Sequence, residues 1–190
     1  MTGTDLDSLL DEPDAAFRRE LGDALAGLDD EDALAGVLVR SPETFEQLTD
    51  RMATLEDIAA FAETDPAAVD QYLTVLWNGV EIVTTNIGSI GAAVTMDTSV
   101  NWCATDSPVA FHATTDPSAG TIAGGPDPLD DPEITFEGHT DVLFSMLGDD
   151  EFNPPLAYVQ NRYEVVGSLE RAREFDRMME TVTADMAAFA

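Results

Sequence analysis

The sequence predicts an α+β fold, in which helices come first and strands are grouped in the second half of the chain. From residue 13 to residue 87, apolar side chains recur at intervals of three and four, the spacing of one helical face. After Gly91 the pattern changes to short segments of alternating apolar and polar residues, separated by turns that contain Asp, Pro or Gly. Helical spacing returns after Ser168. This segregated order favours an antiparallel sheet covered by helices.

The chain begins with an acidic segment, residues 1–12, which we expect to be a flexible tail. Pro13 suits the first turn of a helix, and apolar side chains at helical spacing continue to Leu28. The acidic run 29–32 ends this helix, and a short helix around Leu34 is expected to follow it.

Two later helices start at the same kind of signal, a capping side chain followed by proline. The Ser-Pro pair at 41–42 opens a continuous apolar stripe over residues 45–62. The Asp-Pro pair at 65–66 opens a long helix, and Glu81 is the only charged residue between residues 71 and 96. Because this stretch also contains asparagines and glycines, we expect a buried helix running towards a strand and not a membrane span.

Five strands are expected after this helix, at about residues 100–105, 109–114, 118–125, 134–136 and 163–166. In the first of them, Trp102 is expected on one face of the sheet and Cys103 on the other. A short helix capped by Thr140 ends at Gly148, and Asn153 precedes a proline that starts another. Both helices are inserted before the last strand, and a final helix follows that strand.

The composition indicates a folded protein adapted to high salt. The formal net charge is −30, since 38 residues are Asp or Glu and the eight basic residues are all Arg. Repulsion between these charges is relieved when salt shortens the screening length, to ~3 Å at 1 M. Disorder would require few apolar residues as well, but 44% of the chain is hydrophobic. We therefore expect a protein of an extreme halophile, of the archaeal type.

The same charge excludes several partners and compartments. Nucleic acid binding needs clustered basic residues, and anionic membrane surfaces repel an acidic protein. No secretion signal is visible at the N-terminus. Cys103 is the single cysteine, which leaves no internal disulfide and no cysteine-based zinc site. We expect a cytoplasmic protein with no nucleic acid partner and no stable membrane insertion.

Three segments resemble, in order and spacing, the C-terminal core of sterol-carrier-protein-2 (SCP2) domains. Residues 134–148 read as a strand and a capped helix ending in Gly, residues 153–160 as an Asn-Pro helix start, and residues 163–167 as a strand closing on Gly. The link at 149–152 is longer than in that family. The resemblance implies a five-stranded, largely antiparallel sheet covered by helices. Residues 65–190 would form the SCP2-like domain, and residues 13–64 an N-terminal helical extension.

The resemblance also implies a function, the non-enzymatic binding or carriage of a hydrophobic ligand in an apolar tunnel. A lipid or a linear, isoprenoid-like molecule is expected, with no cofactor and no catalytic residue. Thioether and aromatic side chains suit adaptable apolar pockets, although ordinary core packing is the alternative. The side chains expected to line the tunnel lie on the two inserted helices and the last helix: Leu143, Met146, Leu147, Leu156, Val159, Phe175, Met178 and Met179.

Two hypotheses from other classes stay open. The stripe over residues 45–62 is an alternative surface for a protein partner or for a homodimer. A catalytic role for Cys103, His112 or His139 would require a base or an orienting carboxylate beside it. The sequence has no nucleophile elbow, calcium loop or phosphate loop, and two histidines do not make a histidine-rich metal site.

Overall fold

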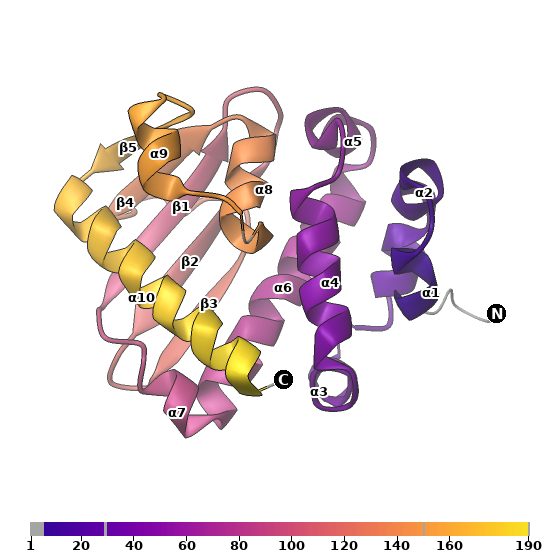
Figure 1. Cartoon of the computed structure of the whole chain (residues 1–190), viewed down its shortest axis with the longest axis horizontal. Coiled ribbons are helices and arrows are strands. Elements are labelled where there is room, and N and C mark those ends of the chain that lie inside the picture. The colour runs from indigo at the N-terminus through magenta and orange to yellow at the C-terminus, as the bar shows by residue number, and fades with distance from the viewer. Residues whose placement is uncertain (1–5, 29, 150, 190) are drawn as a thin grey trace.

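The chain folds into a five-stranded sheet with helices packed on one face and a group of further helices beside it (Figure 1). The computed structural model describes residues 6–28, 30–149 and 151–189. Helices α1 to α5 gather on one side of the long helix α6, and the sheet lies on the other side. The predicted α+β class is confirmed.

Seven helices of the described residues precede the first strand. They are α1 Leu6–Leu10, α2 Asp14–Leu25, α3 Glu31–Arg40, α4 Pro42–Ala53, α5 Ile58–Thr64, α6 Pro66–Asn86 and α7 Gly88–Gly91. The expected flexible tail over residues 1–12 needs a correction, because α1 buries Leu9 completely against the other helices. Residues 1–5 lie outside the described residues.

The apolar stripe predicted over residues 45–62 is divided between two helices. Helix α4 ends at Ala53, and Asp57 then takes a left-handed backbone conformation with φ 48° before α5 begins. The stripe nevertheless points inward throughout, since Leu48 and Leu55 are almost fully buried. Spacing alone did not reveal the break, because Leu55 in the connecting turn keeps the apolar pattern continuous.

The five strands are β1 Thr98–Ala104, β2 Ala110–Asp116, β3 Thr121–Pro126, β4 Ile134–Gly138 and β5 Tyr163–Gly167. Their order across the sheet is β3-β2-β1-β4-β5. The β1–β4 pair is parallel and the other three pairs are antiparallel. The predicted five-stranded, largely antiparallel sheet is therefore confirmed, with β5 as one of its edge strands.

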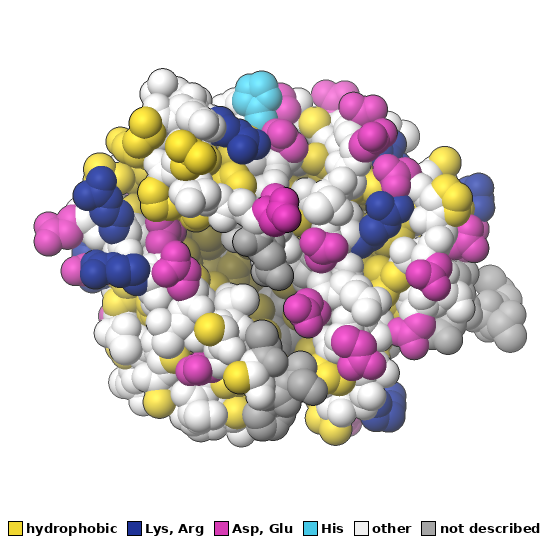
Figure 2. Space-filling view, in the orientation of Figure 1, with side chains coloured by type: hydrophobic (Ala, Val, Ile, Leu, Met, Phe, Trp, Pro, Cys, Tyr) yellow, Lys and Arg dark blue, Asp and Glu magenta, His cyan; other side chains and the backbone are white. Residues whose placement is uncertain are grey.

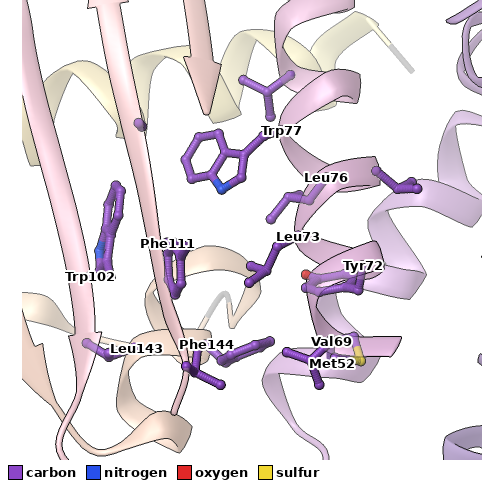
Figure 3. Close-up of a cluster of buried hydrophobic side chains, with 14 of the residues drawn as sticks. Met52, Val69, Tyr72, Leu73, Leu76, Trp77, Trp102, Phe111, Leu143 and Phe144 are labelled. Carbon is purple, nitrogen blue, oxygen red and sulfur yellow. The ribbon is translucent and has the colours of Figure 1, made fainter. Parts of the chain in front are cut away.

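One face of the sheet carries the core. Trp102 of β1 faces the helices and contacts Trp77 of α6, Phe111 of β2 and Phe136 of β4, with ring centroids 5.0–5.8 Å apart. Figure 3 shows Trp77, Trp102 and Phe111 filling the space between α6 and the sheet. On the opposite face, Asn101 exchanges two hydrogen bonds with the backbone of Leu129, which holds the 127–132 loop against the strand.

Three helices of the second half surround the other end of this core: α8 Thr140–Gly148, α9 Pro154–Val159 and α10 Leu169–Phe189. Asn153 caps α9 as predicted, since its side chain accepts a hydrogen bond from the Leu156 amide. The cap of α8 comes from elsewhere, because the Asp106 carboxylate accepts hydrogen bonds from the amide and the hydroxyl of Thr140. Among the described residues, no helix has the length and apolar character needed to span a membrane.

Candidate ligand groove

Helix α10 presents two different faces. Its core face consists of Ala172, Phe175, Met178 and Val182, which are all buried. The neighbouring face carries charged residues at intervals of three, one and three: Arg173, Asp176, Arg177 and Glu180. Helical spacing places these four side chains along a single stripe. The stripe borders the start of α9.

A surface groove of about 390 Å³ lies between this stripe and the start of α9, where Pro154 and Pro155 form the opposite wall. The surface that lines it is mainly apolar, although four charged side chains of α10 belong to its rim. Figure 2 shows this face of the molecule hollowed between the positions of α9 and α10, with hydrophobic side chains on the floor. A concave, mainly apolar site with a few polar groups is the usual form of a small-molecule site.

Hydrogen bonds fix both walls of the groove to the sheet. Near the start of α10, the Arg171 guanidinium donates two hydrogen bonds of 2.8 Å to the Glu133 carboxylate and one to the Asp97 carbonyl. The two bonds from Arg171 to Glu133, together with one from Thr98, hold the pKa of Glu133 below its usual value. At the other wall, the Tyr163 hydroxyl of β5 donates to the Pro154 carbonyl of α9. Both helices that border the groove are thus tied to the sheet or to residues next to it.

Asp176 is the half-buried member of the charged stripe, whereas Arg173, Arg177 and Glu180 are exposed. Burial, and secondly the negative charge of Glu180, raise the pKa of Asp176 to about 6. Burial, together with the charge of Asp176, also raises the pKa of Tyr163 to about 12. The carboxylate of Asp176 forms none of the ion pairs or hydrogen bonds found within the described residues.

The eight side chains expected to line a tunnel fall into three groups. Leu143, Phe175 and Met178 are buried in the core, and Figure 3 shows Leu143 within the cluster of buried side chains. Met146, Leu147 and Met179 pack against the core but stay partly accessible. Leu156 and Val159 are exposed on α9, with 53% and 76% of their surface accessible. The structure therefore assembles these residues around α8, α9 and α10, but it does not direct them into one common space.

The enclosed tunnel implied by the resemblance is not found in the described part of the chain. Phe175 of α10 packs directly on Trp102, with ring centroids 5.8 Å apart, and fills part of the space between helix and sheet. The groove beside α10 and a second hollow over α4 are both open to solvent. The second hollow lies over α4 and is lined by four polar side chains and a glycine: Glu43, Glu46, Gln47, Asp50 and Gly148. The groove beside α10 is therefore the apolar site of the two.

Sequence reasoning missed the charged stripe of α10 and the role of Asp176. The sequence did contain a sign that Asp176 is half-buried, because this residue directly follows Phe175 of the core face and lies between two arginines. On a helical projection it falls at the border between the buried and exposed sides. Which of the four charged residues is drawn inward depends on α9, whose position relative to α10 no local pattern specifies.

The cysteine and the histidines occupy structural positions. Burial and the charge of Glu137 raise the pKa of Cys103, which favours the unreactive thiol. His112 lies 2.8 Å from the Asp127 carbonyl through Nδ1, and His139 lies 3.4 Å from the Asp106 carboxylate that caps α8. Within the residues that the structure describes, no group of three or more His, Cys, Asp or Glu is arranged to hold a metal ion.

The hypothesis that the 45–62 stripe forms a surface for a protein partner is wrong, because the stripe is buried in the fold. Phe45, Leu48 and Met52 are at most 8% exposed because the stripe packs against other helices of the same chain. Phe45 lies against Gly79 of α6, where an added Cβ atom would come within 2.6 Å of the ring. The stripe is part of the core and leaves no free apolar face for a partner.

The chain is similar to known proteins in its three-dimensional structure. No protein-family model matches the chain, and no curated protein matches its sequence. A structure described as "UbiJ-SCP2 Ubiquinone synthesis protein" matches 56% of this chain and 91% of its own, with 8% identity and a TM-score of 0.43.

Two further structures extend the match over more of this chain. The stereoselective inverting sec-alkylsulfatase Pisa1 from Pseudomonas sp. matches 94% of it, with 14% identity and a TM-score of 0.43. A double mutant of the same sulfatase matches 88%, with 14% identity and a TM-score of 0.40. The present chain spans about a third of the sulfatase, 30% and 32% in the two structures.

Proposed function

We propose that this protein binds a lipid-like hydrophobic molecule in the groove between α9 and α10, without catalysing a reaction. The observation that carries the proposal is the groove itself, which is mainly apolar and has a volume of about 390 Å³. Pockets of this size hold small organic ligands, and burial of apolar surface drives their binding. Met179 is partly accessible on α10, the helix that forms one wall of the groove, and its thioether is an adaptable apolar group.

Exposed apolar residues beside the groove also support the proposal. Leu156 and Val159 on α9 are two of the four exposed large hydrophobic side chains in the described residues. An apolar ligand longer than the groove could extend over them and remove their surface from water. The ligand would then lie partly in the groove and partly along α9, in place of the enclosed tunnel expected from the sequence.

Native mass spectrometry of the full chain, purified in high salt, tests the proposal. We expect an additional mass that is released by organic extraction and identified as a lipid or an isoprenoid. In a Pro155→Trp variant, the indole ring would occupy the groove, and we expect the bound fraction to fall. A Val39→Trp variant is the matched control, because Val39 is 83% exposed on α3, far along the chain from the groove. Equal occupancy in the two variants, or an empty wild type that takes up no added lipid, would contradict the proposal.

We further propose that the chain is a cytoplasmic protein of a salt-adapted organism, which the net charge of −30 and the absence of lysine support. Removal of salt should unfold it, because screening of the acidic surface is lost at low ionic strength. Circular dichroism during stepwise dialysis from 3 M to 0.05 M NaCl measures this. Full retention of structure at the lowest salt concentration would refute the salt adaptation and leave the ligand proposal untouched.

A further inference from the structure

The groove has an asymmetric distribution of charge. The two arginines of its rim are exposed on long, flexible stems, and the Arg177 Nε already donates a hydrogen bond to the Arg173 carbonyl. Exposed guanidinium groups attract an anion only weakly, because water and salt screen them. Asp176 is shorter and half-buried, and its carboxylate lines the same groove without a partner among the described residues. A polar group inside the groove would therefore meet the carboxylate under less screening than the guanidinium groups.

An unpaired carboxylate in an apolar groove is costly to keep ionised, and a hydrogen-bond donor removes much of that cost. None of the described residues supplies this donor, although Tyr163 of β5 and Tyr158 of α9 lie on neighbouring elements and Arg173 lies one turn away. Glu180, one turn further along α10, adds a second negative charge at the rim. A cationic donor would offset the repulsion between these two carboxylates and a neutral donor would leave it unchanged, whereas an anionic group would increase it.

Resting on the proposed ligand binding, we infer that the groove takes an amphiphile whose polar end is a hydrogen-bond donor, an ammonium or a hydroxyl group, bound to the Asp176 carboxylate. The apolar chain of the ligand would lie on the floor of the groove and over α9. A ligand that ends in a carboxylate would be rejected, because it would place two unscreened negative charges side by side. Ammonium should bind best, since charge-assisted hydrogen bonds are the stronger ones.

Three probes with the same ten-carbon chain test this inference: decylammonium, decan-1-ol and decanoate, each below its micelle-forming concentration. Isothermal titration calorimetry of the full chain at pH 8 and 1 M NaCl gives the dissociation constants. At this salt concentration the screening length is ~3 Å, so the acidic surface as a whole attracts cations only weakly. We expect affinity to fall from decylammonium to decanol to decanoate, with about tenfold or more between the first and last.

An Asp176→Asn variant should lose most of the preference for decylammonium and should bind decanoate more tightly. A Glu174→Gln variant removes the same charge from an exposed position whose partner is Arg171, outside the groove, and should keep the wild-type order. Wild-type affinity for decylammonium should also decrease as the pH falls through about 6, where Asp176 takes up a proton. The Asp176→Asn variant should lack this step.

Three results would overturn the inference, and they differ in what they say of the proposed function. If all three probes bind with similar affinity and Asp176→Asn changes none of them, the groove binds chains without selecting the polar end, and the proposed function stands. If decanoate binds best and its affinity is unaffected by Asp176→Asn, the arginines determine the ligand class. If none of the probes binds to the wild type or displaces a co-purified lipid, both the inference and the proposed function fail.

Discussion

The helix-covered face of the sheet is packed in two different ways. Beneath α6, rings and backbone are in direct contact, so that Trp77 is 2% exposed and Phe111 is fully buried. Beside β5, the start of α9 stands away from α10 and leaves the groove, with Leu156 and Val159 in contact with solvent. The first region has the dense packing of a protein interior, and the second has the surface of a site.

This difference follows from how each helix is attached to the sheet. Helix α6 has 21 residues and lies so close to β3 that a Cβ atom on Gly124 would come within 2.7 Å of the Trp77 ring. Helix α9 has six residues and covers an edge strand, to which the hydrogen bond between Tyr163 and Pro154 ties it. A long helix can bury a continuous face, whereas a helix of one and a half turns cannot bury both of its sides. We infer that α6 stabilises the fold and α9 shapes the ligand site.

The largest effect should come from removing a ring beneath α6. A Phe111→Ala variant loses the stacked contact with Trp102, and a buried Phe-to-Ala change costs about 3–5 kcal/mol of unfolding free energy. Phe152, which is half-buried next to α9, provides the same substitution in the other region. Urea unfolding at constant high salt should show that Phe152→Ala loses less than half as much unfolding free energy as Phe111→Ala. Equal losses would mean that the two regions are packed alike.

A glycine at the same interface tests the closeness of α6 to the sheet. In a Gly124→Ala variant the new methyl group would lie 2.4 Å from the His112 carbonyl of β2 and 2.7 Å from the Trp77 ring of α6, so the strand backbone and the ring would both have to move. Overpacking of this kind costs about 3 kcal/mol. Gly125 on the same strand is the control, because its nearest neighbour is the His112 ring at 3.8 Å. A Gly125→Ala protein with wild-type stability, beside a strongly destabilised Gly124→Ala protein, would confirm that the constraint acts at Gly124, where α6 and β2 both approach closely.

The tightly packed region was also the one that the sequence predicted well. The alternation of Trp102 with Asn101 and Cys103 gave the faces of β1, and Asp65 with Pro66 gave the start of α6. Each of these features depends on neighbouring residues, which a local pattern records. The five strands followed from the same alternation, but the parallel pairing of β1 with β4 did not. Strand pairing depends on a partner that lies more than 30 residues away.

The site was predicted less well, for the same physical reason. Leu156 and Val159 are three residues apart and so share a face of α9, but spacing does not say whether that face meets the core or the solvent. The Asp106 cap of α8 lies 34 residues before Thr140, beyond the reach of a local capping pattern. Asp176 was overlooked because its burial depends on the approach of α9. Residues placed by contacts between distant segments determine the groove, and sequence patterns identify only the helices that carry them.

A third, smaller effect concerns the pH dependence of stability in the groove region. The pKa of Asp176 is raised to about 6 in the folded chain, above the value of 3.8 expected after unfolding. The folded state therefore binds the proton of the Asp176 carboxyl group more tightly than the unfolded state does. The stability that this proton contributes is present below pH 4 and is lost as the pH rises through 6. Asp176→Asn should be more stable than the wild type at pH 8, on the order of 2 kcal/mol, and similar at pH 4. Unfolding curves at both pH values measure the difference, with Glu174→Gln as the control.

The smallest effect on stability is expected on α9 itself. A Leu156→Ser, Val159→Ser double variant removes apolar surface that is already largely in contact with water, so its unfolding free energy should change by less than about 0.5 kcal/mol per site. Its capacity for a ligand should fall, because the chain of a bound amphiphile would lose the surface over which it extends. Urea unfolding and decylammonium titration on the same preparation separate the two effects. Weakened binding at unchanged stability would assign α9 to the ligand site. A loss of stability comparable to that of Phe152→Ala would instead place these side chains in the core, and the two regions would no longer differ in kind.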